Sequence, residues 1–266
     1  MNKVTSKDGT PIAFDRLGEG PPVILVAGAS GVRSHPLMGQ LAERLAERFT
    51  VYNYDRRGRG DSGDTPPYAV EREIEDIDAL IDAAGEPAYL YGISSGAVLA
   101  LEAASRLPTK VKKLALYEPP FIVDDSRPPL PEDYVPHLNA LIAAGRRGDA
   151  AEYFLTDAIG LPAEYVAPMR NDPMWAELEA VAHTLPYDGT IMGNTMSGKP
   201  LPARRWASVT TPTLVMDGGA SPPFFHNGAQ ALADILPNAQ RRTLEGQSHG
   251  VAPDALAPVL LDFFQD

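Results

Sequence analysis

Short apolar runs alternate with longer segments of helical periodicity along most of this chain, and this alternation restricts the possible folds more than any other feature. Val23–Ala27 is wholly apolar, as expected for a central strand of a parallel sheet that is covered on both faces. The order predicts an α/β fold, with a mostly parallel central sheet flanked by helices. Further strands are predicted at 50–54, 88–91, 111–117, 213–216 and 240–243, and helices at 36–48, 70–84, 95–106, 225–236 and 255–264.

Two regions depart from this strand–helix order. At the start of the chain, Val4–Ser6 and Ile12–Leu17 flank an Asp-Gly turn and predict an antiparallel hairpin. In the middle, residues 121–206 are rich in proline and in helical patterns and contain no convincing strand. We therefore expect a core formed by residues 1–120 and 207–266, with residues 121–206 inserted as a helical cap.

The segment Gly92-Ile93-Ser94-Ser95-Gly96 joins a predicted strand to a predicted helix. A nucleophile elbow requires this setting, because a strained turn presents the serine hydroxyl at the helix N-terminus and small neighbours let strand and helix approach closely. Ser94 is the expected nucleophile, since a role for Ser95 would place Ile93 at a glycine position. Gly-x-Ser-x-Gly strings also occur by chance, so the prediction depends on the strand–helix context.

One histidine is placed to act as a base. His249, within Gly246-Gln-Ser-His-Gly250, lies between the last predicted strand and the last predicted helix. It follows the serine in the chain, as the order nucleophile, acid, histidine requires. The other four histidines are interpreted as surface or capping residues: His35, His137, His183 and His226.

The turn after the first central strand is a candidate oxyanion hole. It reads Ala27-Gly28-Ala29-Ser30-Gly31. The backbone N–H groups of Ala29 and Ser95 are the expected donors to an oxygen that becomes negative during acyl transfer. An ordinary glycine-rich turn remains the alternative for Ala29.

The order of these elements and motifs resembles the α/β-hydrolase superfamily across essentially the whole chain. The run Asp55-Arg-Arg-Gly-Arg-Gly-Asp-Ser62 is similar to the Asp-x-Arg-Gly-x-Gly-x-Ser loop after the fourth strand of those proteins, and we interpret it as a structural turn. Many members carry His-Gly where this chain has Ala27-Gly28. The resemblance implies an α/β-hydrolase fold and a serine hydrolase that needs no metal or organic cofactor.

The acid of the triad has two candidates. Most members of the superfamily place an Asp after the seventh core strand, but Ser221 occupies that position here. Asp217 lies nearby at a predicted strand end, and Glu118 ends the preceding predicted strand. Gly-x-Ser-Ser-Gly together with Glu-Pro-Pro after the sixth strand resembles zearalenone lactonases, whose triad is Ser–Glu–His with the Glu at this location. That resemblance favours Glu118, and Asp217 stays open as the alternative.

The inserted segment is expected to cover the serine and to form the substrate pocket. Trp175, Met192 and Tyr187 are the expected substrate contacts, with Met174 and Met196 as further candidates. No Arg or Lys clamp is evident in the cap, which predicts a neutral, hydrophobic ester or lactone, including a zearalenone-like macrolactone. Carbon–carbon bond hydrolases, haloperoxidase-like enzymes and a non-catalytic ligand-binding protein of the same fold remain alternatives.

Composition excludes several other classes. The formal charge of −12 argues against nucleic-acid partners. The chain has no cysteine, which excludes disulfides, thiol catalysis and cysteine-ligated metals. No apolar run approaches the roughly 20 residues that span a bilayer, and the polar N-terminus does not resemble a signal peptide. We expect a cytoplasmic protein without a membrane partner, of undetermined oligomeric state.

Overall fold

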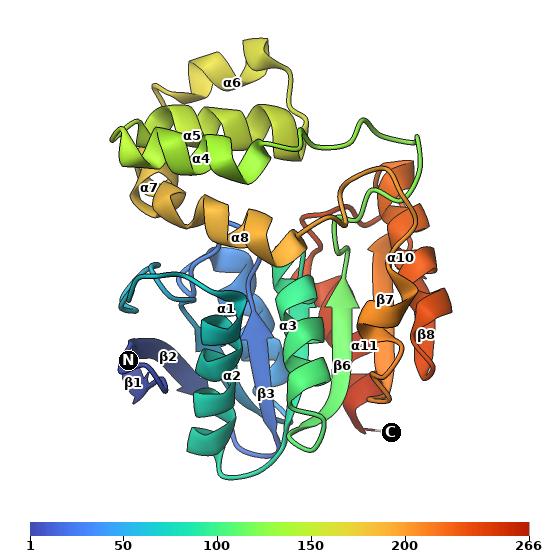
Figure 1. Ribbon diagram of the computed structural model, residues 1–266. Coiled ribbons are helices and arrows are strands. Elements are labelled where there is room, and N and C mark those ends of the chain that lie inside the picture. The colour runs from blue at the N-terminus through green and yellow to red at the C-terminus, as the bar shows by residue number, and fades with distance from the viewer. Residues whose placement is uncertain (266) are drawn as a thin grey trace.

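The strands form one sheet, whose order explains where functional side chains can gather. In the computed structural model, which describes residues 1–265, eight strands follow the order β1-β2-β4-β3-β5-β6-β7-β8 (Figure 1). The strands are β1 (Asn2–Thr5), β2 (Pro11–Leu17), β3 (Pro22–Val26), β4 (Thr50–Tyr54), β5 (Ala88–Ile93), β6 (Val111–Tyr117), β7 (Thr213–Gly218) and β8 (Ala239–Leu244).

Strand direction agrees with the sequence pattern. β1 and β2 form the predicted antiparallel hairpin, and β2 also pairs antiparallel with β4. Every other neighbouring pair in the sheet is parallel. The predicted α/β fold with a mostly parallel sheet is therefore confirmed.

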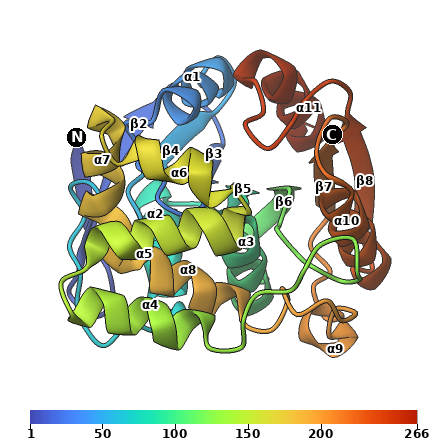
Figure 2. The same ribbon diagram turned by 90° about the horizontal axis from the view of Figure 1, so that it is seen from above.

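Helices cover both faces of the sheet (Figure 2). On one face, α1 (Pro36–Leu45) and α11 (Pro253–Gln265) bury Leu41, Leu45 and Leu260 against the strands. The other face is covered by α2 (Val70–Ala84), α3 (Ser95–Arg106) and α10 (Pro223–Ile235). The apolar residues of α2 recur at helical spacing, which places them on one buried side of the helix.

The predicted element ends differ from the observed ones where the tertiary structure intervenes. Helix α1 is expected to reach Arg48 but ends at Leu45. The chain that follows packs so tightly that a Cβ at Gly18 or Gly20 would lie within 2.5 Å of a backbone oxygen of Ala46, Arg48 or Phe49. Strands β5 and β7 extend two residues further than expected. Pairing continues to Ile93 with Tyr117 and to Gly218 with Leu244, and sequence periodicity does not report such pairing.

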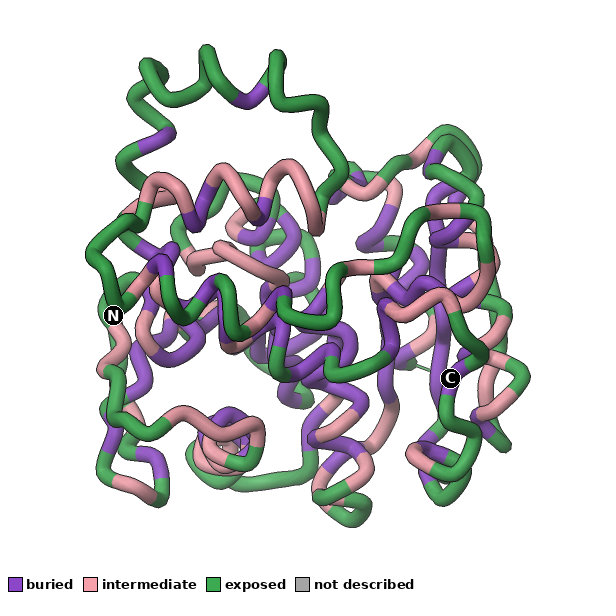
Figure 3. Tube along the Cα trace, turned by 45° about the horizontal axis from the view of Figure 1, so that its top comes forward, coloured by how far each residue is buried: buried purple, intermediate pink, exposed green. Residues whose placement is uncertain are grey.

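The chain between β6 and β7 contains helices and, within the described residues, no strand. Figure 1 shows most of these helices above the carboxyl ends of the parallel strands, and Figure 3 shows that their outermost stretch is mostly exposed. They are α4 (Tyr134–Ala143), α5 (Arg147–Tyr153), the π-helix η1 (Phe154–Ile159), α6 (Ala163–Met169), α7 (Pro173–Val181), η2 (Ala182–Thr184), α8 (Leu185–Met192) and α9 (Ala203–Trp206).

The inserted segment has an apolar core of its own over only part of its length. Tyr134, Leu138, Phe154 and Leu185 belong to this separate cluster. Toward the end of the segment, Trp206 instead packs with the residues that cover the main sheet. The packing of a separate cap thus spans residues 134–185, whereas the expected boundaries at 121 and 206 remain a prediction.

Gly96 is needed where α3 approaches β3. A Cβ at Gly96 would lie 2.4 Å from the carbonyl oxygens of Val26 and Ala27, so the backbone would have to shift. We expect Gly96→Ala to lower the free energy of unfolding by about 2 kcal/mol or more, as overpacked sites do. The measurement is chemical denaturation, with Gly39→Ala in α1 as the control.

At Gly39 a Cβ would meet no atom within 4 Å. Its replacement by alanine should leave stability unchanged or raise it by up to about 1 kcal/mol, because alanine favours the helix. Equal destabilisation by the two substitutions would contradict the crowding argument for Gly96.

No helix among residues 1–265 combines the length and the hydropathy that crossing a membrane demands.

Candidate active site

Ser94 stands in a strained turn between β5 and α3. Its backbone has φ 58° and ψ −131°, a conformation that non-glycine residues adopt rarely and mostly at functional sites. The turn is held by the Ser94 N–H, which donates to the carbonyl of Tyr117 over 2.9 Å. Gly28 packs so closely that a Cβ there would lie 2.9 Å from the Ser94 Cβ. This is the elbow geometry that the sequence predicts.

His249 is hydrogen-bonded to Glu118. The distance from His249 Nδ1 to Glu118 Oε2 is 2.7 Å. An ionised carboxylate can only accept, so in this pairing Nδ1 is the donor, and in the neutral imidazole Nε2 then keeps its lone pair. The imidazole also stacks on the Phe225 ring, with 4.8 Å between centroids. Both contacts fix the orientation of the ring.

Glu118 is itself held in place. The residue is fully buried and has a positive φ of 46°. Its second oxygen, Oε1, accepts the backbone N–H of Gly218 over 2.7 Å. The neighbouring Tyr117 hydroxyl donates to the carbonyl of Ser248 over 2.7 Å, which anchors the loop that carries His249. The carboxylate thus has a partner on each oxygen.

The alternative acid, Asp217, is directed elsewhere. Its carboxylate accepts hydrogen bonds from Arg241 Nε and Nη2 over 3.0 and 3.1 Å, and also contacts Thr243 and the imidazole of His226. Its partners lie on β8 and α10, and the structure does not bring Asp217 to His249. Ser221, at the position of the usual Asp, is buried, and its hydroxyl has no partner within the described residues.

The two expected oxyanion donors lie beside Ser94. Ala29, Ser94, Ser95 and His249 line one cavity. Ser95 is the first residue of α3, so its N–H has no intrahelical acceptor. The loop that carries Ala29 is held from behind, because Arg59 Nη1 donates to the carbonyl of Gly28 over 2.7 Å. Both residues therefore line the cavity that contains Ser94, and their role as oxyanion donors stays a prediction.

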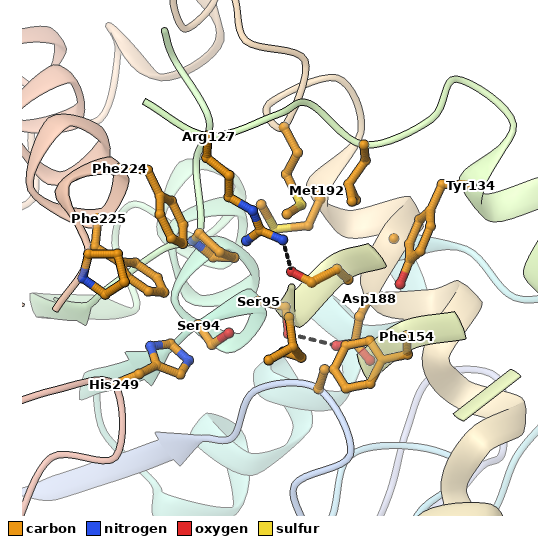
Figure 4. Close-up of a pocket in the computed structure, with 18 of the residues that line it drawn as sticks. Ser94, Ser95, Arg127, Tyr134, Phe154, Asp188, Met192, Phe224, Phe225 and His249 are labelled. Carbon is orange, nitrogen blue, oxygen red and sulfur yellow. Dashed lines mark hydrogen bonds between the residues drawn. The ribbon is translucent and has the colours of Figure 1, made fainter. Parts of the chain in front are cut away.

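The cavity has a volume of about 280 Å³ and is mostly apolar (Figure 4). Ser94 and His249 lie next to each other at its base, and residues of the inserted segment form the opposite side. The apolar lining includes Leu130, Phe154, Met192, Met196, Phe224 and Phe225. Of the expected substrate contacts, Met192 and the further candidate Met196 lie here.

Trp175 and Tyr187 do not line this cavity. The Trp175 ring packs with Ala151 and Val166 in a small cluster of the inserted segment, and its indole N–H donates to Glu179. Tyr187 stacks on Tyr68, with 3.9 Å between ring centroids, and its hydroxyl donates to Asp64. Met174 is exposed. Composition identifies large apolar side chains in the cap, but their direction depends on how the helices pack.

Asp188, on α8, is a cavity residue that the sequence analysis does not identify. Its carboxylate is 2.7 Å from Arg56 Nη1 and 2.5 Å from Arg59 Nη2, and it accepts the Ser95 hydroxyl over 2.8 Å. Burial by itself would raise the pKa of Asp188, but the Arg59 and Arg56 guanidiniums hold it below its ordinary value. The two arginines belong to the loop 55–62, which the sequence analysis interprets as a structural turn.

The loop 55–62 is the part of the sequence that could have indicated a buried carboxylate partner such as Asp188. Three arginines within 55–62 are fully buried, and buried guanidiniums require carboxylate partners. The sequence does not say which carboxylates these are. Arg57 uses Asp76 and Asp8 of the core, whereas Arg59 reaches across to Asp188 of the inserted segment.

Arg127 is the second cavity residue that the sequence analysis misses. It precedes two prolines in the connection between β6 and α4, and it lines the cavity from the side of the inserted segment (Figure 4). An isolated arginine in a loop has no periodicity that would indicate where its side chain points. Among residues 1–265, no three His, Asp or Glu side chains are grouped so that they could hold a metal ion.

Comparison with known proteins is consistent with this geometry. The profile of the Alpha/beta hydrolase family matches residues 23–259. A solved structure of an alpha/beta hydrolase from Sphaerobacter thermophilus is 59% identical, covers 99% of this chain and 100% of its own, and superposes with a TM-score of 0.90.

Two curated relatives match over shorter stretches. The uncharacterized hydrolase YraK of Bacillus subtilis is 35% identical over 115 residues, 42% of either chain. The pimeloyl-[acyl-carrier protein] methyl ester esterase of Chromobacterium violaceum is 35% identical over 120 residues, 43% of this chain and 44% of its own. The chain therefore spans less than half the length of these two relatives.

Proposed function

The chain belongs to the alpha/beta hydrolase family, and on that premise we propose that it hydrolyses a carboxylic ester or lactone through Ser94, His249 and Glu118. The observation that carries the proposal is the 2.7 Å contact between His249 Nδ1 and Glu118, made beside a serine in a strained turn at the same cavity. This contact leaves Nε2 of His249 available as a base for the serine hydroxyl.

In the proposed mechanism, His249 Nε2 accepts the hydroxyl proton while the Ser94 oxygen attacks the substrate carbonyl. Glu118 keeps the imidazole in the required tautomer and stabilises its charged form. The Ala29 and Ser95 N–H groups receive the tetrahedral oxyanion. The imidazolium then protonates the leaving alkoxide, and water attacks the acyl-enzyme in a second, equivalent cycle.

The substrate proposal rests on the lining of the cavity. Apolar side chains dominate it, which supports a hydrophobic body next to the scissile bond. The esterase name of the Chromobacterium relative supports ester chemistry, and the resemblance to zearalenone lactonases makes a macrolactone one candidate. The sequence predicts a neutral substrate, whereas the cavity contains a cationic side chain, Arg127.

The test is covalent labelling with a fluorophosphonate, followed by mass spectrometry of the digested protein. We expect one adduct on the Ser94 peptide, and none in a folded Ser94→Ala variant. Ser95→Ala is the matched control and should still be labelled at Ser94. A well-folded wild-type protein that is not labelled would contradict the proposal and favour a non-catalytic ligand-binding role.

A substrate panel complements the labelling. It contains p-nitrophenyl esters of short and medium acids, simple lactones and zearalenone, each with wild type and Ser94→Ala. Turnover that requires Ser94 supports the proposal, and the preferred member identifies the substrate class. Labelling without turnover of any ester or lactone would point to a carbon–carbon bond hydrolase or a haloperoxidase-like enzyme instead.

A further inference from the structure

Arg127 presents a cationic group to a cavity that is otherwise mostly apolar. Its side chain is half-buried, and the guanidinium lies over the Phe224 ring, 4.9 Å from the centroid. Nη2 donates to the carbonyls of Asp157 and Ala158 over 2.9 and 2.7 Å, near the end of η1. These two bonds fix the position of the guanidinium, and Figure 4 shows it at the cavity next to Phe224.

The remaining donors of Arg127 have no acceptor in the part of the chain that the structure describes. Nε and Nη1 make no hydrogen bond to residues 1–265, and no carboxylate of those residues forms a salt bridge with this arginine. Among the described residues, Asp188 is the one carboxylate that lines the cavity, and it is already bound by Arg56 and Arg59. Burial accordingly lowers the pKa of the Arg127 guanidinium.

The two unpartnered donors are not fully buried, so a ligand in the cavity can reach them, and the partial desolvation of a guanidinium without a counter-ion is offset when an anion binds. The lack of a counter-ion is notable in a chain with a formal charge of −12, where anionic partners for arginine are plentiful. A bound ligand that supplies the charge would satisfy Nη1 and Nε through charge-assisted hydrogen bonds.

We propose that Arg127 binds a carboxylate carried by the substrate, at the end remote from the scissile ester or lactone bond. This inference rests on the proposed function and narrows the substrate to a half-ester, or an acid-bearing lactone, with an apolar chain between the two groups. Leu130, Met192 and Phe224 line the cavity that this chain would occupy.

The charge and size of the cavity favour this ligand over other anions. Apart from His249, Arg127 is the only basic side chain among the described residues that line it, so the ligand is better matched by a monoanion than by a phosphate dianion. A volume of about 280 Å³ is at the lower end for small-molecule sites, which suits a short chain.

The first test compares two esters that differ only in charge: mono-p-nitrophenyl adipate and its methyl-capped, neutral counterpart. For wild type we expect kcat/KM to be about 10- to 100-fold higher for the acid than for the neutral ester. A difference of this size is usual for one hydrogen bond between charged groups. Arg127→Met should reduce this ratio to about one, mainly through KM. Arg127→Lys should retain part of it, because the charge remains.

Arg147→Met is the matched control. Arg147 also donates to a backbone carbonyl, that of Ala180, and makes no salt bridge within the described residues, but it is exposed and does not line the cavity. This variant should keep the wild-type ratio. A wild-type ratio of one or less, or an unchanged ratio in Arg127→Met, overturns the proposal.

A binding measurement separates failure of this proposal from failure of the proposed function. Monomethyl adipate and dimethyl adipate are titrated calorimetrically into Ser94→Ala protein. The carboxylate site is supported if the acid binds saturably and at least about 10-fold more tightly than the diester, and if this binding is lost in the Ser94→Ala, Arg127→Met double variant. This holds even if no ester is turned over. Equal or absent binding of the two compounds overturns the site, even if neutral esters are hydrolysed.

Discussion

Replacing Glu118 by glutamine is expected to lower kcat about 10³-fold or more, with a much smaller effect on KM. The carboxylate is fully buried and 2.7 Å from His249 Nδ1. Glutamine preserves the size of the side chain but removes the charge that stabilises the imidazolium, and its amide can hold the ring in the wrong tautomer. The rate is measured as p-nitrophenolate release under saturating substrate.

Asp217→Asn is the control for this prediction. Asp217 is equally buried, but its partners are Arg241, Thr243 and His226. We expect kcat within a few-fold of wild type, together with a loss of stability from the altered ion pair with Arg241. A larger loss of kcat in Asp217→Asn than in Glu118→Gln, both folded by circular dichroism, would reverse the assignment of the acid.

Asp188→Asn should lower the free energy of unfolding by about 3–5 kcal/mol, the usual cost of breaking a buried ion pair from one side. Asp188 is buried and is shared by Arg56 and Arg59, so both guanidiniums would lose their common counter-charge. The measurement is denaturant unfolding at neutral pH.

Asp149→Asn provides a matched comparison in the same inserted segment. Asp149 also bridges two arginines, Arg146 and Arg170, but all three side chains are about one-third or more exposed. Its loss should cost at most about 1 kcal/mol, because solvent screens exposed pairs. If the two substitutions lowered the free energy of unfolding equally, burial would not be what makes the ion pairs of Asp188 important for stability.

The effect of Asp188→Asn should also depend on pH. The pKa of Asp188 is lowered in the folded protein, so its carboxylate contributes stability above the ordinary aspartate range and loses that contribution as the pH falls through the folded value. The difference between wild type and Asp188→Asn is therefore expected to be largest near neutrality and to shrink well below about pH 4.

The sequence predicts most of the core fold because its signals are local. Wholly apolar runs such as β3 and the one-sided periodicity of α2 arise from burial of each element against the sheet. The positions of Ser94 and His249 follow from the same signals, since each lies in a strand-to-helix loop at the same edge of the sheet. These predictions required no knowledge of side-chain direction.

The remaining parts of the site depend on direction and on distant partners. Glu118 and Asp217 both end or nearly end a strand, and only the fold shows that one meets His249 and the other meets Arg241. Trp175 is expected in the cavity as an apolar residue of the cap, but it packs against Val166 instead. Arg127 lies in an aperiodic loop, so no pattern in the sequence places it at the cavity.

The position of Glu118 has a consequence for how this protein can diversify. Ser94 and Glu118 extend from the adjacent strands β5 and β6, both completed before the inserted segment begins. Insertions, deletions or recombination within that segment therefore leave the spacing of Ser94 and Glu118 intact. The remaining requirement is that the chain after the segment still brings His249 to Glu118. A foreign cap grafted between β6 and β7 would still need one acidic residue facing Arg56 and Arg59, a simple rule for selecting donors in chimeric libraries.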